Sequence, residues 1–366
     1  MVKPKLLLGL TATSAALLLL VIAGQKVSTD KAGIINDVLG LSQVKVGTLE
    51  SDEVEGSAYA ESDGSLSNAG LKRMLADSYK FCEETVEQGS VLFKNAEKDG
   101  KPVLPLEKGE RRVTLFGRGS RNLFMRSGAG GAAPNPNLVV RLDAAFENSG
   151  FTINKAVFKK YTKLSQSQMT SPGTNVEDSV SIYNDVKDTF DQYSDAAIVT
   201  FVRIGTENTD PSSGQLDLKQ NEKDLLKMIK DSGKFKKTIV LINSPLAMSM
   251  DWADKEEYGV DAIVYVGVPG YYGAGGIPHV LMGKAGKEDN AAVVNPSGHA
   301  VDTFAASASS SPAYVNFGDS QIAVYSEGVY VGYKYYETRY EDLVLGQGNA
   351  DGTKGVFNST GAWNYA

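Results

Sequence analysis

Short runs of apolar residues alternate along the central part of the chain with stretches in which apolar residues recur every third or fourth position. The runs predict buried β-strands, and the recurring positions predict amphipathic helices. The strands are expected at 90–94, 112–117, 151–154, 196–201, 238–242 and 262–266, and the helices at 68–88, 137–148, 220–232 and 275–282. Continuous apolar strands separated by helices are typical of a largely parallel sheet covered on both faces. The pattern therefore predicts an α/β fold, a layered α/β sandwich with a mostly parallel sheet.

Two segments do not follow this alternation. Residues 155–193 are expected to be helical, with a surface loop near 166–175 where Ser, Thr and Gly residues gather. The aromatic run Tyr325–Tyr340 is bounded by turns, which favours strand or domain-junction packing over stacking against a sugar. No closing element follows this run, so we expect the sequence to be incomplete.

The N-terminal segment has a different character and is expected to precede the sandwich as a hydrophobic helix. Residues Leu6–Ala23 are uncharged and mostly apolar, and they follow Lys3 and Lys5. A helix of this length reaches roughly 27 Å, close to the hydrocarbon thickness of a bilayer. The run fits both an uncleaved membrane anchor and a signal peptide, and the preceding lysines place the rest of the chain outside the membrane. The expected localisation is the outer face of the cell membrane, or secretion if the segment is cleaved.

Shifts in composition divide the chain into four parts. Residues 1–26 are the predicted anchor or signal, and residues 27–66, rich in Ser, Asp, Glu and Gly, are a predicted linker. Residues 67–305 carry the α/β pattern, and residues 306–366 are expected to be an aromatic-rich tail of the same domain.

Charge and residue counts exclude several classes of function. The formal net charge is −7 and no basic run occurs, which argues against a nucleic-acid partner, because phosphate binding requires a basic face. Cys82 is the only cysteine, so neither an intrachain disulfide nor a thiolate metal cluster can form. His279 and His299 are the only histidines, too few for a histidine-rich metal site. We expect no metal and no organic cofactor.

Acidic side chains follow the strand predicted at 196–201. The stretch Phe201–Leu218 opens into a polar loop that carries Glu207 and Asp210. Ligands of open α/β sheets bind beyond the carboxyl ends of the strands, so this loop is the first candidate for chemistry. Taken alone, carboxylates in a loop are more often solvated surface groups.

A glycine-rich segment, Gly117–Gly131, follows the strand predicted at 112–117. Successive glycines expose backbone N–H groups that can hold an anion, which makes a nucleotide or anion site one interpretation. The segment lacks the Walker spacing and the Gly-x-Gly-x-x-Gly fingerprint, so turn formation is the simpler interpretation for its glycines.

Further short motifs occur in a fixed order between residues 70 and 340. They are Glu87–Asn95 with Leu104–Leu106, Val113–Gly117, Val240–Asn243, Pro269–Gly270 with Gly275–Gly276, Asn295–Gly298 with Asp302–Phe304, and Glu327–Glu337. No single motif is diagnostic, but the ordered set resembles the C-terminal α/β-sandwich domain of glycoside hydrolase family 3, which includes many β-glucosidases. An anchor followed directly by this domain is similar to family members in which the sandwich precedes a fibronectin-like module and a (β/α)8 barrel.

The resemblance implies a division of the catalytic groups between two domains. Retaining glycosidases use one carboxylate as the nucleophile and a second one as the general acid/base. By resemblance the barrel, which is absent from this sequence, supplies the aspartate nucleophile, and Glu207 in Gly205–Asp210 is the acid/base. The resemblance implies that Arg118 and Ser120 lie in a loop directed toward the barrel's active-site mouth and that Asp210 is a polar neighbour of Glu207. Arg118, Ser120 and Asp210 are therefore the expected substrate-binding residues.

The expected function is that of an exported or membrane-anchored glycosidase domain. It would contribute the general acid/base to hydrolysis of β-glucosides or related O-glycosides, with an oligosaccharide or glycoside as substrate. Activity would require a barrel domain from a downstream segment or a separate chain. Two alternatives stay open: a non-catalytic carbohydrate-binding or interaction module, and an α/β domain that binds a nucleotide or anion at the glycine-rich loop.

Overall fold

The computed structural model of the protein describes two units of the chain, Met1–Leu66 and Ser67–Ala366. The described residues are 14, 17–18, 20–22, 24–26, 68–126, 139–169, 175–205, 211–212, 214–308, 328–329 and 331–345. In the first unit the described residues are helical and exposed. Among all residues that the structure describes, no helix combines the length and the apolar composition that crossing a bilayer requires.

A six-stranded sheet forms the centre of the second unit, in the order β1-β8-β7-β6-β4-β5. The strands are β1 (Val91–Asn95), β4 (Arg112–Phe116), β5 (Thr152–Ile153), β6 (Ala196–Val202), β7 (Thr238–Asn243) and β8 (Ala262–Tyr265). β1 pairs antiparallel with β8, and the pairings among the other strands are parallel. Every residue of β6 and β7 is buried, as expected for strands covered on both faces. The predicted α/β fold with a mostly parallel sheet is confirmed.

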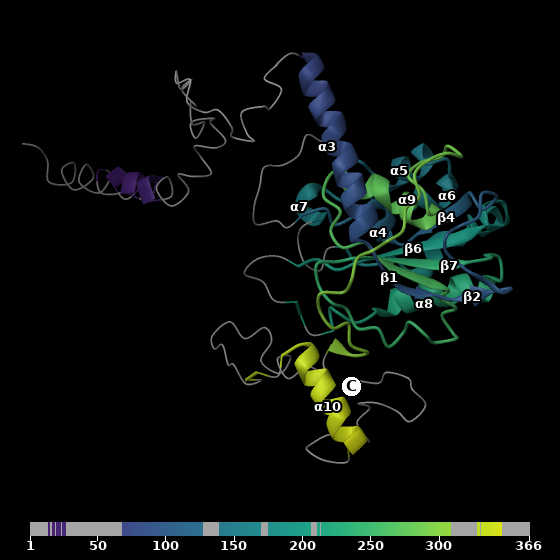
Figure 1. Ribbon diagram of the computed structural model, residues 1–366. Helices are drawn as coiled ribbons and strands as arrows, with labels where there is room; N and C mark the ends of the chain where they lie inside the picture. The colour runs from purple at the N-terminus through teal and green to yellow at the C-terminus, as the bar shows by residue number, and fades with distance from the viewer. Residues whose placement is uncertain are drawn as a thin grey trace, which may run out of the picture. The chain divides into compact units, whose positions relative to one another are not determined.

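Helices cover both faces of this sheet (Figure 1). The main ones are α3 (Asn68–Gly89), α5 (Leu142–Asn148), α8 (Gln220–Ser232) and α9 (Gly276–Met282). Ile198 and Leu241 point into the core shared with α3, α5 and α9, whereas Val199 and Val240 point into the core shared with α8. Successive side chains of a strand point to opposite faces, so each strand contributes to both cores.

The helix ends follow the signals in the sequence. α3 ends at Gly89. Gly233 caps α8 with φ 59°, and Gly283 caps α9 with φ 68°. Both glycines have a left-handed backbone, which costs a residue without a Cβ almost nothing. These stops coincide with the predicted ones.

The prediction of long helices within residues 155–193 is wrong. This segment forms α6 (Lys155–Phe158), α7 (Gln166–Met169) and the 3-10 turns η1 (Val180–Tyr183) and η2 (Lys187–Tyr193). Local side chains compete with helical hydrogen bonds here. The Ser179 hydroxyl accepts from the Ser181 backbone N–H, and the Thr189 hydroxyl donates to the Val186 carbonyl at 2.6 Å. Such bonds favour short turns.

The aromatic run near the C-terminus also differs from the prediction. Tyr333–Leu345 forms a helix, α10, so the strand alternative is wrong for these residues. Lys334 and Glu337 favour a helix because their straight side chains lose little rotamer freedom in it. The hydroxyl of Thr338 donates to the Lys334 carbonyl one turn earlier, at 2.7 Å. Domain-junction packing of this segment stays a prediction.

Candidate functional site

Two connections leave the sheet at neighbouring positions on its carboxyl edge. One follows β4 and begins with the short helix α4 (Arg118–Arg121), and the other follows β6 and leads to α8. Gly119 allows α4 to lie directly against β6, because a Cβ at this position would come within 2.5 Å of the Thr200 carbonyl oxygen. The pairing of β4 with β6 is parallel, so both connections start at the same edge.

The side chains of Arg118 and Ser120 have different surroundings. Ser120 is buried, and its hydroxyl forms hydrogen bonds with the Phe116 carbonyl at 2.6 Å and the Thr200 hydroxyl at 2.9 Å. The Arg118 guanidinium makes a two-pronged ion pair with Asp178. The Arg118 side chain is therefore only partly exposed and paired with a carboxylate, whereas Ser120 is fully engaged inside the fold. Substrate binding by either residue stays a prediction.

Glu177 is a buried residue whose carboxyl group contacts the start of α4. Its Oε2 accepts the backbone N–H of Arg118 at 2.8 Å. Burial raises the pKa of Glu177 to about 8, the Arg118 N–H opposes this rise, and the negative charges of Glu222 and Asp178 add to it. Its Oε1 makes no hydrogen bond with any described residue. At neutral pH Glu177 is therefore mostly protonated.

A buried ion pair closes the base of the connection between β6 and α8. Both guanidinium nitrogens Nη1 and Nη2 of Arg203 donate to the Glu222 carboxylate, each at 2.8 Å. The two side chains are only 5% and 7% exposed. Arg203 also donates to the backbone carbonyls of Val202 at 2.9 Å and Asp217 at 2.8 Å. A two-pronged arginine–carboxylate pair fixes both distance and orientation.

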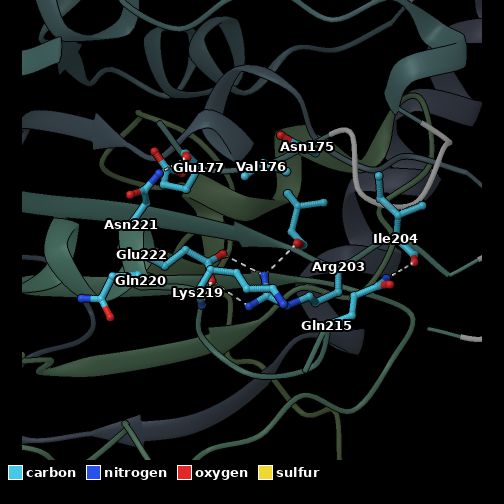
Figure 2. A pocket seen from close by; sticks show the side chains of 11 residues that line it. Asn175, Val176, Glu177, Arg203, Ile204, Gln215, Lys219, Gln220, Asn221 and Glu222 are labelled. Atoms are coloured by element: carbon cyan, nitrogen blue, oxygen red, sulfur yellow. Dashed lines mark hydrogen bonds and ion pairs between the residues drawn. The ribbon is translucent and has the colours of Figure 1, made fainter. Parts of the chain in front are cut away.

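An open pocket of about 310 Å³ lies beside this ion pair. It is lined by residues 175–177, by 202–204 at the end of β6, and by Gln215 with residues 219–222 at the start of α8. Figure 2 shows the Arg203 and Glu222 side chains in contact, and Glu177 and Asn221 next to each other. Asn221 donates to the Glu177 carbonyl at 2.8 Å and so joins α8 to the segment that holds Arg118.

The predicted site residues Glu207 and Asp210 lie outside the described residues. The described residues next to them show how their loop is anchored. The Gln215 side-chain amide donates to the Ile204 carbonyl at 3.0 Å, and Ile204 is buried. The loop therefore begins and ends at the carboxyl edge, beside Arg203.

Other titratable groups contribute to packing. His279, on α9, forms a 2.6 Å contact between its Nδ1 and the Oε1 of Glu87 on α3, so it ties two helices together. His299 is exposed. In the part of the chain that the structure describes, no three His, Cys, Asp or Glu side chains are placed to hold a metal ion.

Sequence patterns indicate little about three of these residues, Glu177, Arg203 and Glu222. Arg203 carried a weak signal, because it is a charged residue directly after an apolar strand. Glu222 is an acidic residue in the first turn of a helix, a common position for a capping group. Glu177 carried no signal, since its burial depends on tertiary packing.

The fold and this edge of the sheet define an α/β sandwich domain with a polar site where β4 and β6 end. The profile of the Glycosyl hydrolase family 3 C-terminal domain matches residues 90–333. The chain belongs to glycoside hydrolase family 3, through its C-terminal domain. The resemblance inferred from the ordered motifs is thereby confirmed.

Curated relatives and solved structures give the same picture. The chain is 27% identical over 280 residues to a beta-glucosidase of Ruminococcus albus, covering 73% of this chain and 28% of that protein. It is 27% identical over 289 residues to beta-glucosidase A of Butyrivibrio fibrisolvens, covering 70% of this chain and 32% of that protein. The chain thus spans about a third of the length of these relatives or less.

Two solved structures share the fold. A beta-glucosidase from Paenibacillus barengoltzii matches with a TM-score of 0.58 and 24% identity, over 71% of this chain and 28% of that one. Beta-glucosidase 3B from Thermotoga neapolitana matches with a TM-score of 0.55 and 25% identity, over 73% of this chain and 36% of that one.

Proposed function

We propose that this domain contributes the general acid/base, Glu207, to the hydrolysis of β-glucosides or related O-glycosides. The observation that carries the proposal is family membership together with the position of the Glu207 loop. This loop starts directly after β6, and its described ends are held at the carboxyl edge of the sheet. In open α/β sheets this edge is where ligands bind.

The proposed chemistry has two steps and needs a second carboxylate. In the first step Glu207 donates its proton to the glycosidic oxygen as the bond to the anomeric carbon breaks and the nucleophile attacks that carbon. In the second step the Glu207 carboxylate accepts a proton from water, whose oxygen displaces the nucleophile and releases the sugar. By family resemblance the nucleophile is an aspartate of a barrel domain, so activity requires that domain.

We assign Arg118 and Asp210 to substrate contact in this scheme. Arg118 is the better supported of the two, because Asp178 fixes its guanidinium while leaving 19% of the side chain exposed. Ser120 contributes by holding α4 against β6 through its internal hydrogen bonds. The contacts of Arg118 argue against an anion site at this turn, because its backbone N–H already binds the Glu177 carboxyl group and its guanidinium already binds Asp178.

Glu207→Gln, assayed with the barrel polypeptide present, tests the acid/base assignment. Hydrolysis of alkyl glucosides, which have poor leaving groups, should fall by about 10²- to 10⁴-fold, while cleavage of dinitrophenyl glucosides should be far less affected. Azide should restore turnover of the activated substrate in Glu207→Ala and yield a β-glucosyl azide, because azide needs no general base. Glu256→Gln, at an exposed position, is the matched control.

Two outcomes would contradict the assignment. One is an equal loss on both substrates, and the other is an unchanged rate in Glu207→Gln. Saturable binding of a glucoside without turnover, in the presence of a barrel, would instead support the non-catalytic carbohydrate-binding alternative.

We also propose that the apolar segment Leu6–Ala23 exports the domain and either anchors it or is cleaved. The support is its uncharged composition and the lysines that precede it. Protease added to intact cells should digest the domain, and extraction at alkaline pH should separate the anchored form from the secreted one. Protection from the protease would contradict export.

A further inference from the structure

We propose that Arg203, held by Glu222, is a positioning residue that fixes the base of the loop carrying Glu207 and so aligns the proton donor. This inference rests on the proposed function. The geometry that supports it is a single guanidinium bound to both ends of the loop.

The contacts of Arg203 bridge the strand and the returning segment. Its Nη1 donates to the Val202 carbonyl, where β6 ends, and its Nη2 donates to the Asp217 carbonyl, just before α8. The Gln215 amide adds a second bridge to the Ile204 carbonyl. The two ends of the loop are therefore fixed relative to each other by three hydrogen bonds from two side chains.

We call the Arg203–Glu222 pair, with the hydrogen bonds of Arg203 to the Val202 and Asp217 carbonyls, the clasp. Glu222 connects the clasp to α8. Its Oε2 accepts from Arg203 Nη2 and also from the backbone N–H of Lys219, each at 2.8 Å. Glu222 thus caps the first turn of the helix and neutralises Arg203 with the same carboxylate. Any displacement of the ion pair would shift the strand end, the loop end and the helix start together.

The pair is better explained by positioning than by stability. A buried ion pair stabilises a fold no better than apolar side chains of similar volume, because desolvation offsets its attraction. What the pair supplies is a fixed geometry, with four hydrogen bonds from one planar group. Glu207 follows Arg203 by four residues, so at most roughly 14 Å of chain separates the clasp from the proton donor.

A small shift at this distance has a large effect on proton transfer. A misplacement of about 1 Å in a catalytic group can reduce a rate by about 100-fold. Substrates with poor leaving groups depend on the proton donor, and activated ones do not. Loss of the clasp should therefore affect the two kinds of substrate differently, whereas general destabilisation would affect both equally.

The experiment uses the polypeptide with its barrel and replaces both partners, Arg203→Met with Glu222→Leu, so that no charge stays buried alone. Circular dichroism and urea unfolding check that the variant folds. The kcat/KM for alkyl glucosides should fall about 10- to 100-fold, and that for dinitrophenyl glucosides within about threefold. Glu222→Gln, which keeps hydrogen-bonding groups, should fall between wild type and the double variant.

A second pair provides the matched control. Lys237 and Glu110 form a 2.6 Å ion pair near the opposite edge, with side chains 12% and 15% exposed. Lys237→Met with Glu110→Leu removes a comparable pair, and both classes of substrate should then change by the same factor.

A double-mutant cycle shows whether Arg203 acts through Glu207. On the Glu207→Gln background, replacing the clasp should change the rate by about twofold or less, because the group it positions is gone. Additive losses, equal losses on both substrates, or an unchanged rate in the folded double variant would overturn the inference. If instead Glu207→Gln itself shows no dependence on the leaving group, the proposed function fails and the clasp is not the cause.

Discussion

The two edges of the central sheet hold carboxylates in opposite ways. At the amino edge Asp195 accepts from the Arg112 backbone N–H at 2.9 Å and pairs with Lys236 at 2.7 Å, and the Lys236 side chain is 60% exposed. At the carboxyl edge Glu177 also accepts a backbone N–H, that of Arg118, but has no cationic partner among its described contacts. The same kind of hydrogen bond thus occurs in two electrostatic settings.

The electrostatic surroundings of Asp195 and Glu177 decide whether each carboxyl group is ionised. Burial alone would raise the pKa of Asp195, but the hydrogen bond and charge of Lys236, with the N–H and charge of Arg112, outweigh it and lower the pKa. Burial dominates at Glu177 and raises the pKa to about 8. The amino edge therefore favours charged carboxylates that stabilise strand starts, and the carboxyl edge retains neutral or internally paired groups beside a pocket. Perturbed groups of the second kind concentrate at functional sites.

The largest effect on stability is expected from breaking the buried pair at the carboxyl edge. Glu222→Ala leaves the Arg203 guanidinium buried without a counter-charge, which should reduce the free energy of unfolding by about 3–5 kcal/mol. Urea unfolding at pH 7 measures this change. Arg203→Met combined with Glu222→Leu should recover most of the loss, since no buried charge remains. A double variant as unstable as Glu222→Ala would show that the pair itself stabilises the fold.

The next effect concerns Glu177 and depends on pH. Its pKa is raised from 4.5 to about 8 in the folded protein. The stability that this group contributes is fully present below pH 4.5 and is lost as the pH rises toward 8, because the unfolded chain ionises first. Glu177→Gln removes the titration while keeping an acceptor for the Arg118 N–H. The free energy of unfolding of the variant, compared with that of wild type, should therefore increase by roughly 2–5 kcal/mol as the pH rises from 5 to 8.

Chemical unfolding of both proteins at several pH values tests this prediction. Ser181→Ala, in the nearby turn η1, is a control without a titratable group and should show the pH dependence of wild type. A stability difference between Glu177→Gln and wild type that does not change with pH would contradict the raised pKa.

Much of the fold was predictable because it follows from local pattern. The fully buried β6 and β7 were visible as apolar runs. Gly233 and Gly283 marked helix ends because a helix commonly ends at a residue with a left-handed backbone, which glycine adopts without strain. The segment 155–193 was not predictable in this way. Its turns depend on hydrogen bonds such as that of Thr189 with the Val186 carbonyl, which compete closely with helix formation.

The site was predictable only in part. Glu207 was predicted from its position after an apolar strand and from family resemblance, both properties of one short stretch, and its role stays a prediction. Glu177 and Arg118 meet across 59 positions of sequence, and Arg203 and Glu222 across 19. Which carboxylate meets which cation is decided by the sheet order and the path of each connection, and no local pattern records either.

The smallest effect should come from the amino edge and have the opposite sign to that of Glu177. The pKa of Asp195 is lowered, so its contribution to stability is present above its unfolded pKa near 3.8 and is lost as the pH falls through its folded value. Asp195→Asn keeps an acceptor for the Arg112 N–H and loses the pair with Lys236. Because Lys236 is largely exposed and solvent screens the pair, the loss at pH 7 should be about 1 kcal/mol. The difference from wild type should shrink below pH 4, whereas that of Glu177→Gln grows between pH 5 and pH 8. If both substitutions gave the same pH dependence, the contrast between the two edges would be contradicted, since it requires one carboxyl group that folding ionises and one that folding neutralises.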